Sequence, residues 1–246
     1  MTFRKLLPAL SILLILALSG SIFVYGSLKR KNRTNVYNVT ADGYIHGREL
    51  LEKYSSEISP SYILSDTTFV PTDPENSFAA YIENAPLAVV CKPVGSFKQL
   101  YNSSIQEVHV LQVLKGSKSL EKTNIMFTQM SAVLPEEKIL TRSFVNFMKE
   151  GDTYLLFLYN YGNNPLYEFY LNVPGKYSTD NMTLSIPYFN LSDKHNVLTP
   201  YDRNEIVPVT RVKYSEVADN EFFCADEATL NRILEFKKDV LNRYLP

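Results

Sequence analysis

The sequence predicts a mostly β protein of the α+β class, preceded by an apolar helix and closed by an amphipathic one. Three observations predict this. Residues 6–28 carry no charge, residues 86–190 contain several strand-like segments, and residues 226–244 repeat apolar side chains at helical spacing. The 246-residue chain also contains 17 Tyr and 14 Phe, an enrichment that favours strands over helices.

The leading apolar segment is long enough to cross a membrane. As a helix, its 23 residues would extend about 34 Å, close to the thickness of a bilayer's hydrocarbon core. Arg4 and Lys5 precede it, which is the order found in secretory signals and signal-anchors. A cleaved signal has a shorter apolar stretch, so residues 22–25 favour an uncleaved anchor. Cleavage near residues 17–19 would instead give a secreted protein.

The charges around this segment leave its orientation open. Residues 29–33, which follow the apolar segment, contain four basic side chains, whereas Arg4 and Lys5 precede it. Because the following side is slightly more basic, the positive-inside rule favours a cytoplasmic domain. The signal-like start and the β-rich remainder favour an extracytoplasmic one. We expect a single-pass membrane protein that contacts the membrane through residues 6–28, with its folded part outside the cytoplasm.

Residues 29–85 are expected to form a juxtamembrane stalk with short helices. The segment 32–43 is polar and has no period, whereas residues 45–58 place apolar side chains at roughly helical spacing. Asp73 and Pro74 suit the N-cap and the first position of a second helix that runs to about Asn84.

The β domain is expected within residues 86–190. We predict strands at 87–94, 107–115, 124–130, 153–161, 167–173 and 182–186. Residues 108–114 and 154–159 should be neighbouring strands of one curled sheet. A helix is predicted at 141–150, with Gly151 at its C-terminal cap.

Residues 191–246 are expected to form a C-terminal extension that ends in a helix at 226–244. Ile233, Leu234 and Val240 belong to its apolar stripe. Asp226 and Glu227 are acidic residues in the first turn, and basic residues dominate later turns, which complements the helix dipole. We expect the apolar stripe to pack on the sheet.

Four short motifs resemble the netrin-like or TIMP-like modules of exported proteins. They are AVVCKPV at 88–94, VHVLQVLKGS at 108–117, EGDTYLLFL at 150–158 and PGKY at 174–177. The resemblance covers residues 86–177 and implies an OB-like five-stranded barrel. Metalloproteinase inhibitors of that family carry an N-terminal cysteine and many disulfides, whereas this chain has no cysteine before Cys91. The resemblance therefore implies a fold and no inhibitory activity.

Cys91 and Cys224 are the only cysteines. In an oxidising compartment they could form a disulfide across a long loop, worth about 3–5 kcal/mol. The alternative is two unrelated buried thiols. Neither cysteine has a histidine at the spacing of a structural zinc site, so no metal is expected.

The sequence excludes several classes of function. A net charge of −1 gives no basic field for nucleic acid, and no phosphate-binding loop or other cofactor motif occurs. His109 lies within a predicted strand and suits a half-buried structural role, His46 a surface or capping role, and His195 an exposed turn. The acidic residues at 219–227 lack the spacing of a calcium loop and are expected at the surface.

One aromatic loop is a candidate binding site. Tyr159, Tyr161 and Tyr167 surround the turn 162–165, where they could stack on a sugar or a peptide. We therefore expect a non-enzymatic binding module for an unknown protein or glycan. The alternatives are a cell-surface hydrolase built from dispersed carboxylates or His109, and a membrane-tethered cytoplasmic domain. Sequons for N-glycosylation, relevant to a eukaryotic host, occur at Asn32, Asn38, Asn102, Asn181 and Asn190.

Overall fold

The computed structural model describes residues 45–61, 63–64, 78–100, 103–129, 131–141, 144–160, 182–202, 210 and 212–246. The chain divides into two compact units, Met1–Ile45 and His46–Pro246. Apart from Ile45, all of the described residues belong to the second unit. The predicted anchor at 6–28 lies outside the described residues. Of the helices within them, none combines the length and the apolar composition that crossing a membrane requires.

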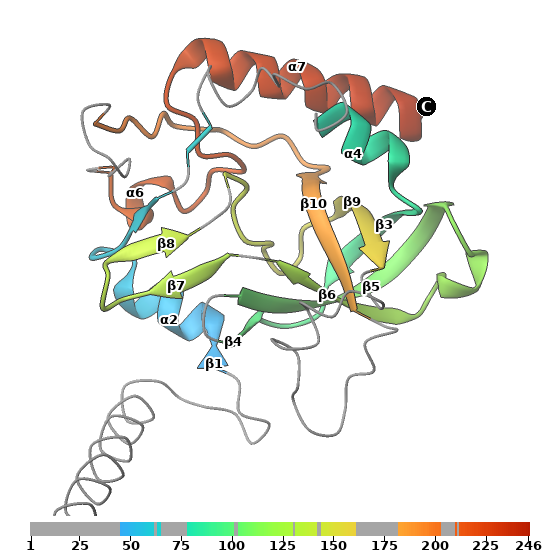
Figure 1. The fold of residues 1–246 in the computed structure, drawn as a ribbon, viewed down its shortest axis with the longest axis horizontal. Coiled ribbons are helices and arrows are strands. Elements are labelled where there is room, and N and C mark those ends of the chain that lie inside the picture. Colours follow the sequence, from blue (N-terminus) through green and yellow to red (C-terminus); the bar gives the residue numbers. More distant parts are fainter. Residues whose placement is uncertain are drawn as a thin grey trace, which may run out of the picture. The chain divides into compact units, whose positions relative to one another are not determined.

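The second unit is a mixed α/β structure in which most regular elements are strands (Figure 1). A seven-stranded sheet has the order β1-β4-β5-β3-β9-β10-β6. Its strands are β1 (Ile45–His46), β4 (Lys98–Leu100), β5 (Ser103–Lys115), β3 (Leu87–Pro93), β9 (Tyr154–Asn160), β10 (Met182–Asn190) and β6 (Asn124–Gln129). A three-stranded sheet has the order β2-β8-β7, with β2 (Ser59–Pro60), β8 (Ile139–Thr141) and β7 (Ala132–Leu134).

The helical elements lie around these sheets. They are α2 (Gly47–Tyr54), α4 (Phe78–Asn84), the 3-10 helix η2 (Lys118–Leu120), α6 (Tyr214–Val217) and α7 (Glu227–Tyr244). The helix predicted at 226–244 is confirmed as α7, whereas the helix predicted at 45–58 is shorter than expected: α2 covers Gly47–Tyr54, and Ile45–His46 form β1. The described part of the helix predicted to end at Asn84 is α4.

The long strand β5 organises the larger sheet because it pairs with β4, β3 and β6. β9 pairs with both β3 and β10, and β10 pairs in parallel with β6. Five strands, β3, β5, β6, β9 and β10, are thus each hydrogen-bonded to two others of the five. The prediction that 108–114 and 154–159 are neighbours is wrong: they share the sheet, but β3 lies between them and pairs with each.

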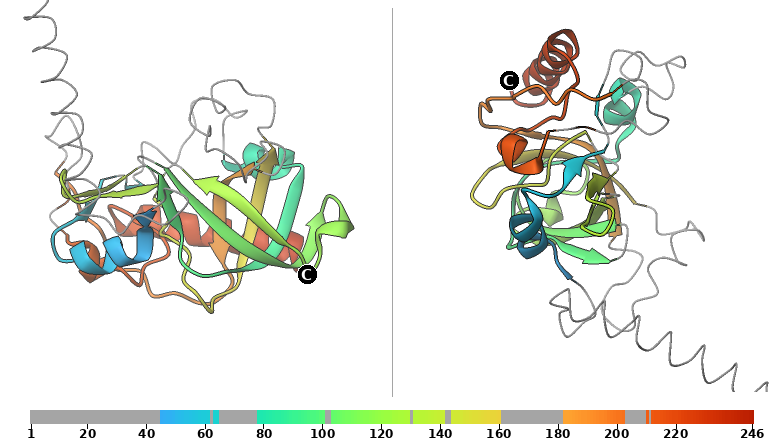
Figure 2. Two further views of the ribbon diagram at one scale, coloured as in Figure 1. Left: turned by 90° about the horizontal axis from the view of Figure 1, so that it is seen from below. Right: turned by 90° about the vertical axis from the view of Figure 1, so that its left-hand side faces the viewer.

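The central strand β9 is buried on both faces. Every side chain from Tyr154 to Leu158 in β9 is at most 3 % exposed. Such a strand needs cover on both sides, and α7 supplies part of it (Figures 1 and 2). The ring of Phe157 lies 5.1 Å from that of Tyr244, and the ring of Phe189 lies 6.2 Å from that of Phe236.

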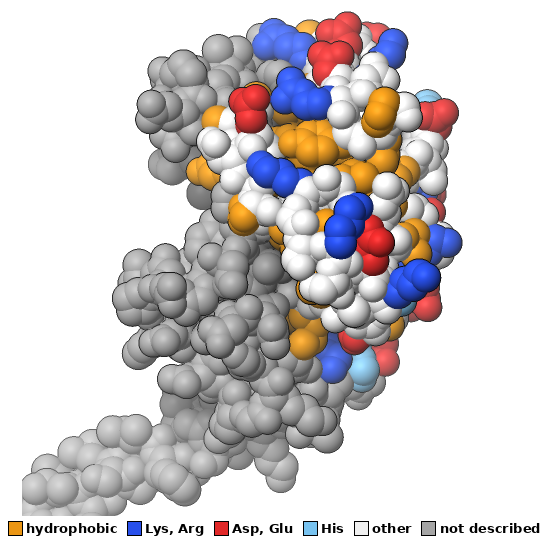
Figure 3. Space-filling view, turned by 90° about the vertical axis from the view of Figure 1, so that its right-hand side faces the viewer, with side chains coloured by type: hydrophobic (Ala, Val, Ile, Leu, Met, Phe, Trp, Pro, Cys, Tyr) orange, Lys and Arg blue, Asp and Glu red, His pale blue; other side chains and the backbone are white. Residues whose placement is uncertain are grey.

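α7 begins where its capping residue predicts. The side chain of Asp226 accepts a hydrogen bond of 2.9 Å from the backbone N–H of Thr229, which satisfies one of the free donors of the first turn. Ile233 and Val240 of the predicted stripe are buried. Viewed from the C-terminal end of α7, charged side chains outline the upper edge of the molecule and apolar ones remain visible beneath them (Figure 3).

The helix predicted at 141–150 is wrong. The described residues from Phe144 onward form an extended segment, in which Val145 makes a bridge with Phe222. An amphipathic helix needs a polar face, yet every residue from Phe144 to Met148 is buried. The ring of Phe144 packs against that of Phe222, and the ring of Phe147 stacks on that of Phe97. Gly151 has a φ of +92° in the turn that leads to β9, not at a helix end.

Gly47, the first residue of α2, packs directly against the ring of Phe97. A Cβ at this position would lie 1.9 Å from a ring carbon, and the ring cannot easily move because it stacks on Phe147 at 3.9 Å. We expect Gly47→Ala to lower the free energy of unfolding by about 1–3 kcal/mol. Urea denaturation measures this, with Glu52→Ala on the exposed side of the same helix as control. Equal stability of the two variants would contradict the close contact.

Candidate functional site

The predicted aromatic loop falls almost wholly outside the described residues. The backbone of Tyr159 belongs to β9 and pairs with Leu184, but its side chain, Tyr161 and Tyr167 lie outside them. A binding role for this loop therefore stays a prediction.

The three histidines lie on separate elements. His109 is half-buried on β5, with its Nδ1 2.8 Å from the side-chain oxygen of Asn124, and Asn124 in turn donates to the carboxylate of Glu107 at 2.9 Å. The predicted structural role of His109 agrees with these bonds. His46 precedes α2, and His195 is exposed in a loop. Within the described ranges, no group of three or more His, Cys, Asp or Glu side chains is arranged to hold a metal ion.

The expectation that the acidic residues at 219–227 all lie at the surface is wrong for Glu221. Its side chain is 3 % exposed and lies 2.6 Å from the Nζ of Lys237, which is 11 % exposed on α7. The other carboxylate oxygen accepts a hydrogen bond of 2.8 Å from the backbone N–H of Asn190. Burial raises the pKa of Glu221, opposed by the positive charge of Lys237.

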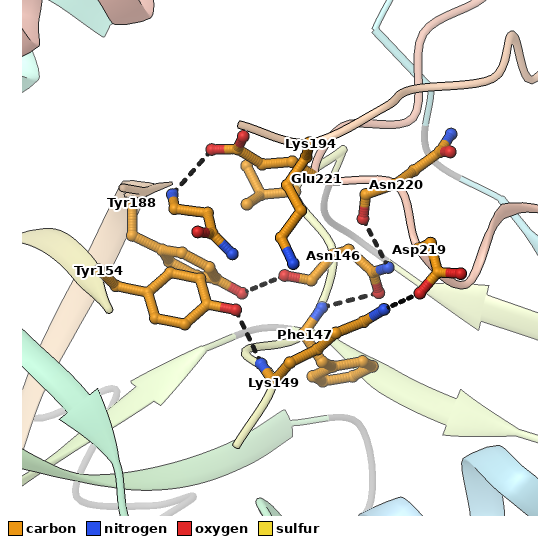
Figure 4. A pocket seen from close by; sticks show the side chains of 11 residues that line it. Asn146, Phe147, Lys149, Tyr154, Tyr188, Lys194, Asp219, Asn220 and Glu221 are labelled. Atoms are coloured by element: carbon orange, nitrogen blue, oxygen red, sulfur yellow. Dashed lines mark hydrogen bonds and ion pairs between the residues drawn. The ribbon is translucent and has the colours of Figure 1, made fainter. Parts of the chain in front are cut away.

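Asn146 is the centre of a buried polar cluster (Figure 4). Its side-chain nitrogen donates to the backbone carbonyls of Ala218 and Asn220, at 3.0 and 2.9 Å. Its side-chain oxygen accepts from the backbone N–H of Phe147 at 2.8 Å and from the hydroxyl of Tyr214 at 3.0 Å. All four hydrogen-bonding positions of the amide are used, so Asn146 fixes the segment before β9 against the segment after α6.

Two further tyrosines approach this cluster from the strands. The hydroxyl of Tyr188 on β10 donates to the backbone carbonyl of Asn146, and that of Tyr154 on β9 accepts from the backbone N–H of Lys149 at 2.8 Å. Burial raises the pKa of Tyr154, Tyr188 and Tyr214. These phenols therefore stay neutral near neutral pH and act as hydrogen-bonding groups.

Charged side chains complete the cluster, and each is paired. Lys149 contacts Asp219, and Lys194 lies 2.8 Å from Asp152. The cavity among these groups has a volume of about 10 Å³, which suits about one water molecule. Several ionisable side chains converge here, but the space is too small for a substrate.

Asn190, one of the five sequon residues, belongs to the same cluster. It is 2 % exposed, and its side-chain nitrogen donates to Asp152 at 2.8 Å. A glycan would replace a hydrogen on this nitrogen and needs open solvent around it. We expect glycopeptide mapping of folded protein from a eukaryotic secretory host to find Asn190 unmodified. Occupancy of Asn190 in correctly folded protein would contradict its burial.

A larger hollow opens on the other side of residues 147–149. This cleft has a volume of about 570 Å³, within the usual range of ligand sites, about 300–1,000 Å³. Residues of α2 and α6 and their C-terminal ends, of the segment before β9, and Phe97 just before β4 line it. They are Arg48, Leu51, Glu52, Ser55, Phe97, Phe147, Met148, Lys149, Glu150, Tyr214, Ser215 and Ala218.

The cleft has an apolar floor and a charged rim. The stacked rings of Phe97 and Phe147 and the side chain of Met148 are each no more than 6 % exposed and form the floor. At the rim, the guanidinium of Arg48 lies 3.5 Å from the carboxylate of Glu150, with the two side chains 37 % and 61 % exposed.

Backbone hydrogen bonds hold the two helical walls of the cleft together. The backbone N–H of Ser215 donates to the carbonyl of Ser55 at 2.9 Å, and that of Tyr214 donates to the carbonyl of Ile58 at 2.9 Å. The end of α2 is thereby joined to the start of α6. The cleft is a preformed feature of the fold.

The two cysteines are free and buried in the same apolar core, so the disulfide considered from the sequence is not formed in this structure. Burial raises the pKa of both thiols, that of Cys224 to about 12. We expect neither to react with iodoacetamide at about pH 8 in the native protein, and both to react after denaturation. If the denatured chain reacted with iodoacetamide only after a reductant was added, the two thiols would not be free.

Sequence reasoning missed the cleft residues because they are far apart in the chain. Arg48 and Glu150 are separated by about a hundred positions, and although Glu150 begins the segment EGDTYLLFL, no sequence pattern links it to Arg48. A comparison with known proteins found no family model, no curated protein and no solved structure that matches the chain.

Proposed function

We propose that the chain is a membrane-anchored, extracytoplasmic binding module that acts without catalysing a reaction. The observation that carries this proposal is the cleft, which combines a rigid apolar floor with paired charges at its rim. Such a surface can bury part of a ligand and orient it by polar contacts. The anchor is inferred from the uncharged segment 6–28 and the basic residues that flank it.

We further propose that β3, β5, β6, β9 and β10 form a partly open, OB-like barrel. Two observations support it: each strand pairs with two others of the set, and β6–β10 is the parallel pair among antiparallel ones. OB-folds are partly open barrels that bind ligands through strands and loops. The resemblance of residues 86–177 to netrin-like modules agrees with this assignment.

The charged groups favour binding over catalysis. A nucleophile or general base needs access to substrate and an activated protonation state. In the part of the chain that the structure describes, the carboxylates nearest the centre, Glu221 and Asp152, are engaged by lysines. Of the two, Glu221 lines the small cavity, which has room for about one water.

Methyl NMR tests the binding function directly. With the full chain in lipid nanodiscs and its methionine methyl groups labelled with carbon-13, Met148 reports on the cleft floor, and Met126 on β6 serves as the internal reference. We expect N-acetyl-leucine methylamide, a minimal apolar peptide unit, to shift the Met148 signal saturably and to leave Met126 unchanged.

Two variants on α6 provide the matched controls. Ser215 is exposed and lines the cleft, so Ser215→Trp should fill its opening and abolish the shift. Glu216 is exposed beside it and does not line the cleft, so Glu216→Trp should bind as the natural chain does. The absence of any Met148 shift, or equal shifts at Met148 and Met126, would overturn the proposal.

A further inference from the structure

Arg48 is placed to receive a carboxylate from a ligand in the cleft. Its backbone N–H donates to the hydroxyl of Ser96 at 3.1 Å, which fixes the residue at the start of α2. Its guanidinium meets Glu150 in a contact of 3.5 Å between two partly exposed side chains. Exposed ion pairs of this kind contribute little to stability, so a ligand carboxylate can take the place of Glu150 at small cost.

The two cations at the rim differ in availability. Lys149 is engaged by Asp219, and its backbone is fixed by the hydroxyl of Tyr154. Arg48 presents a planar fork of donors, which suits a carboxylate held by two parallel hydrogen bonds. The contact of Arg48 with Glu150 is the longer of the two ion pairs, so Arg48 is the rim cation better suited to receive a carboxylate.

The apolar part of the cleft begins one helical turn from this guanidinium. Leu51 follows Arg48 by three positions on α2, so both project from the same face of the helix, and both line the cleft. One turn spans about 5 Å, which is similar to the separation between a carboxylate and the end of the side chain in one apolar amino acid. The floor of Phe97, Phe147 and Met148 continues the apolar surface.

We propose that the cleft binds the C-terminal residue of a peptide that ends in an apolar amino acid. The terminal carboxylate pairs with Arg48, and the last side chain packs on Leu51 and the floor. This inference rests on the proposed binding function and adds the class of ligand. It requires a free carboxylate, whereas the binding function alone does not.

A comparison of two probes separates the inference from the function on which it rests. N-acetyl-leucine carries the free carboxylate and N-acetyl-leucine methylamide does not, and both are titrated against the Met148 methyl signal. We expect the acid to bind about tenfold more tightly, as one charge-assisted contact allows. Equal affinity would overturn the carboxylate assignment and leave the binding function intact, whereas no Met148 shift with either probe would overturn both.

Two variants of α2 locate the effect. Arg48→Gln should abolish the preference for the acid while the methylamide still binds. Lys53→Gln removes the same charge from an exposed site on the same helix outside the cleft, and the preference should persist. A tenfold preference that survives in Arg48→Gln, or is lost in Lys53→Gln, would overturn the role of Arg48. An unchanged Met126 signal establishes that both variants are folded.

Discussion

Replacing Lys237 by Met is expected to lower the free energy of unfolding by about 3–5 kcal/mol. The substitution leaves Glu221, a side chain only 3 % exposed, without its cation in the interior. Removing both charges in Glu221→Gln/Lys237→Met should restore the stability to within about 1 kcal/mol, because the buried charge is gone and Gln can still accept the hydrogen bond from Asn190. Urea denaturation of the two variants measures the difference.

The pH dependence identifies the cause. Lys237 lowers the pKa of Glu221 against the effect of burial, so without Lys237 the folded-state pKa lies further above the unfolded value. The folded state of Lys237→Met then takes up a proton more readily than the unfolded chain. Its stability should recover as the pH falls through the folded-state pKa of Glu221 and decline again as the pH rises.

Lys238→Met is the matched control, since Lys238 is exposed next to Lys237 on α7. It should change the stability by no more than about 0.5 kcal/mol. A pH-independent loss in Lys237→Met, or an equal loss in the control, would contradict the buried ion pair.

Asn146→Ala is expected to cost about 2–4 kcal/mol, because four buried hydrogen bonds end on its amide. Tyr214→Phe removes only one of the four and should cost about 1 kcal/mol. Thermal or urea denaturation measures both, and Asn242→Ala on the exposed side of α7 provides a control of the same chemistry. A cost for Asn146→Ala no larger than that for Tyr214→Phe would show that Asn146 does not organise the cluster.

The local sequence pattern correctly predicted two kinds of element: a strand that is apolar on both faces and a helix with one apolar stripe. The segment TYLLFLYNY is apolar on both faces and became β9, and the stripe of α7 with its Asp226 cap became a helix at the predicted place. Residues 144–148 match neither pattern, because all five are buried against segments that are distant in the sequence. Their helical spacing was a coincidence that only tertiary contacts could reveal.

The candidate site was less accessible to sequence reasoning than the fold. From the sequence, Glu221 and Lys237 are expected at the surface, because charged side chains are rarely buried unless they are paired. Their pairing depends on how α7 packs in the folded chain. One signal was available: Lys237 lies between Ile233 and Val240 on the apolar stripe of α7, where a charge requires a partner. The cleft had no comparable signal, because α2, Phe97, residues 147–150 and α6 meet only in the folded chain.

Labelling of one introduced cysteine in intact cells tests the central claim, that this domain lies outside the cytoplasm. The natural thiols are buried, so Lys238→Cys on the exposed side of α7 adds a single reactive site, and the unmodified chain is the control. We predict that a membrane-impermeant maleimide labels Lys238→Cys without permeabilisation. Labelling that appears only after the membrane is opened would place the domain in the cytoplasm and contradict the account.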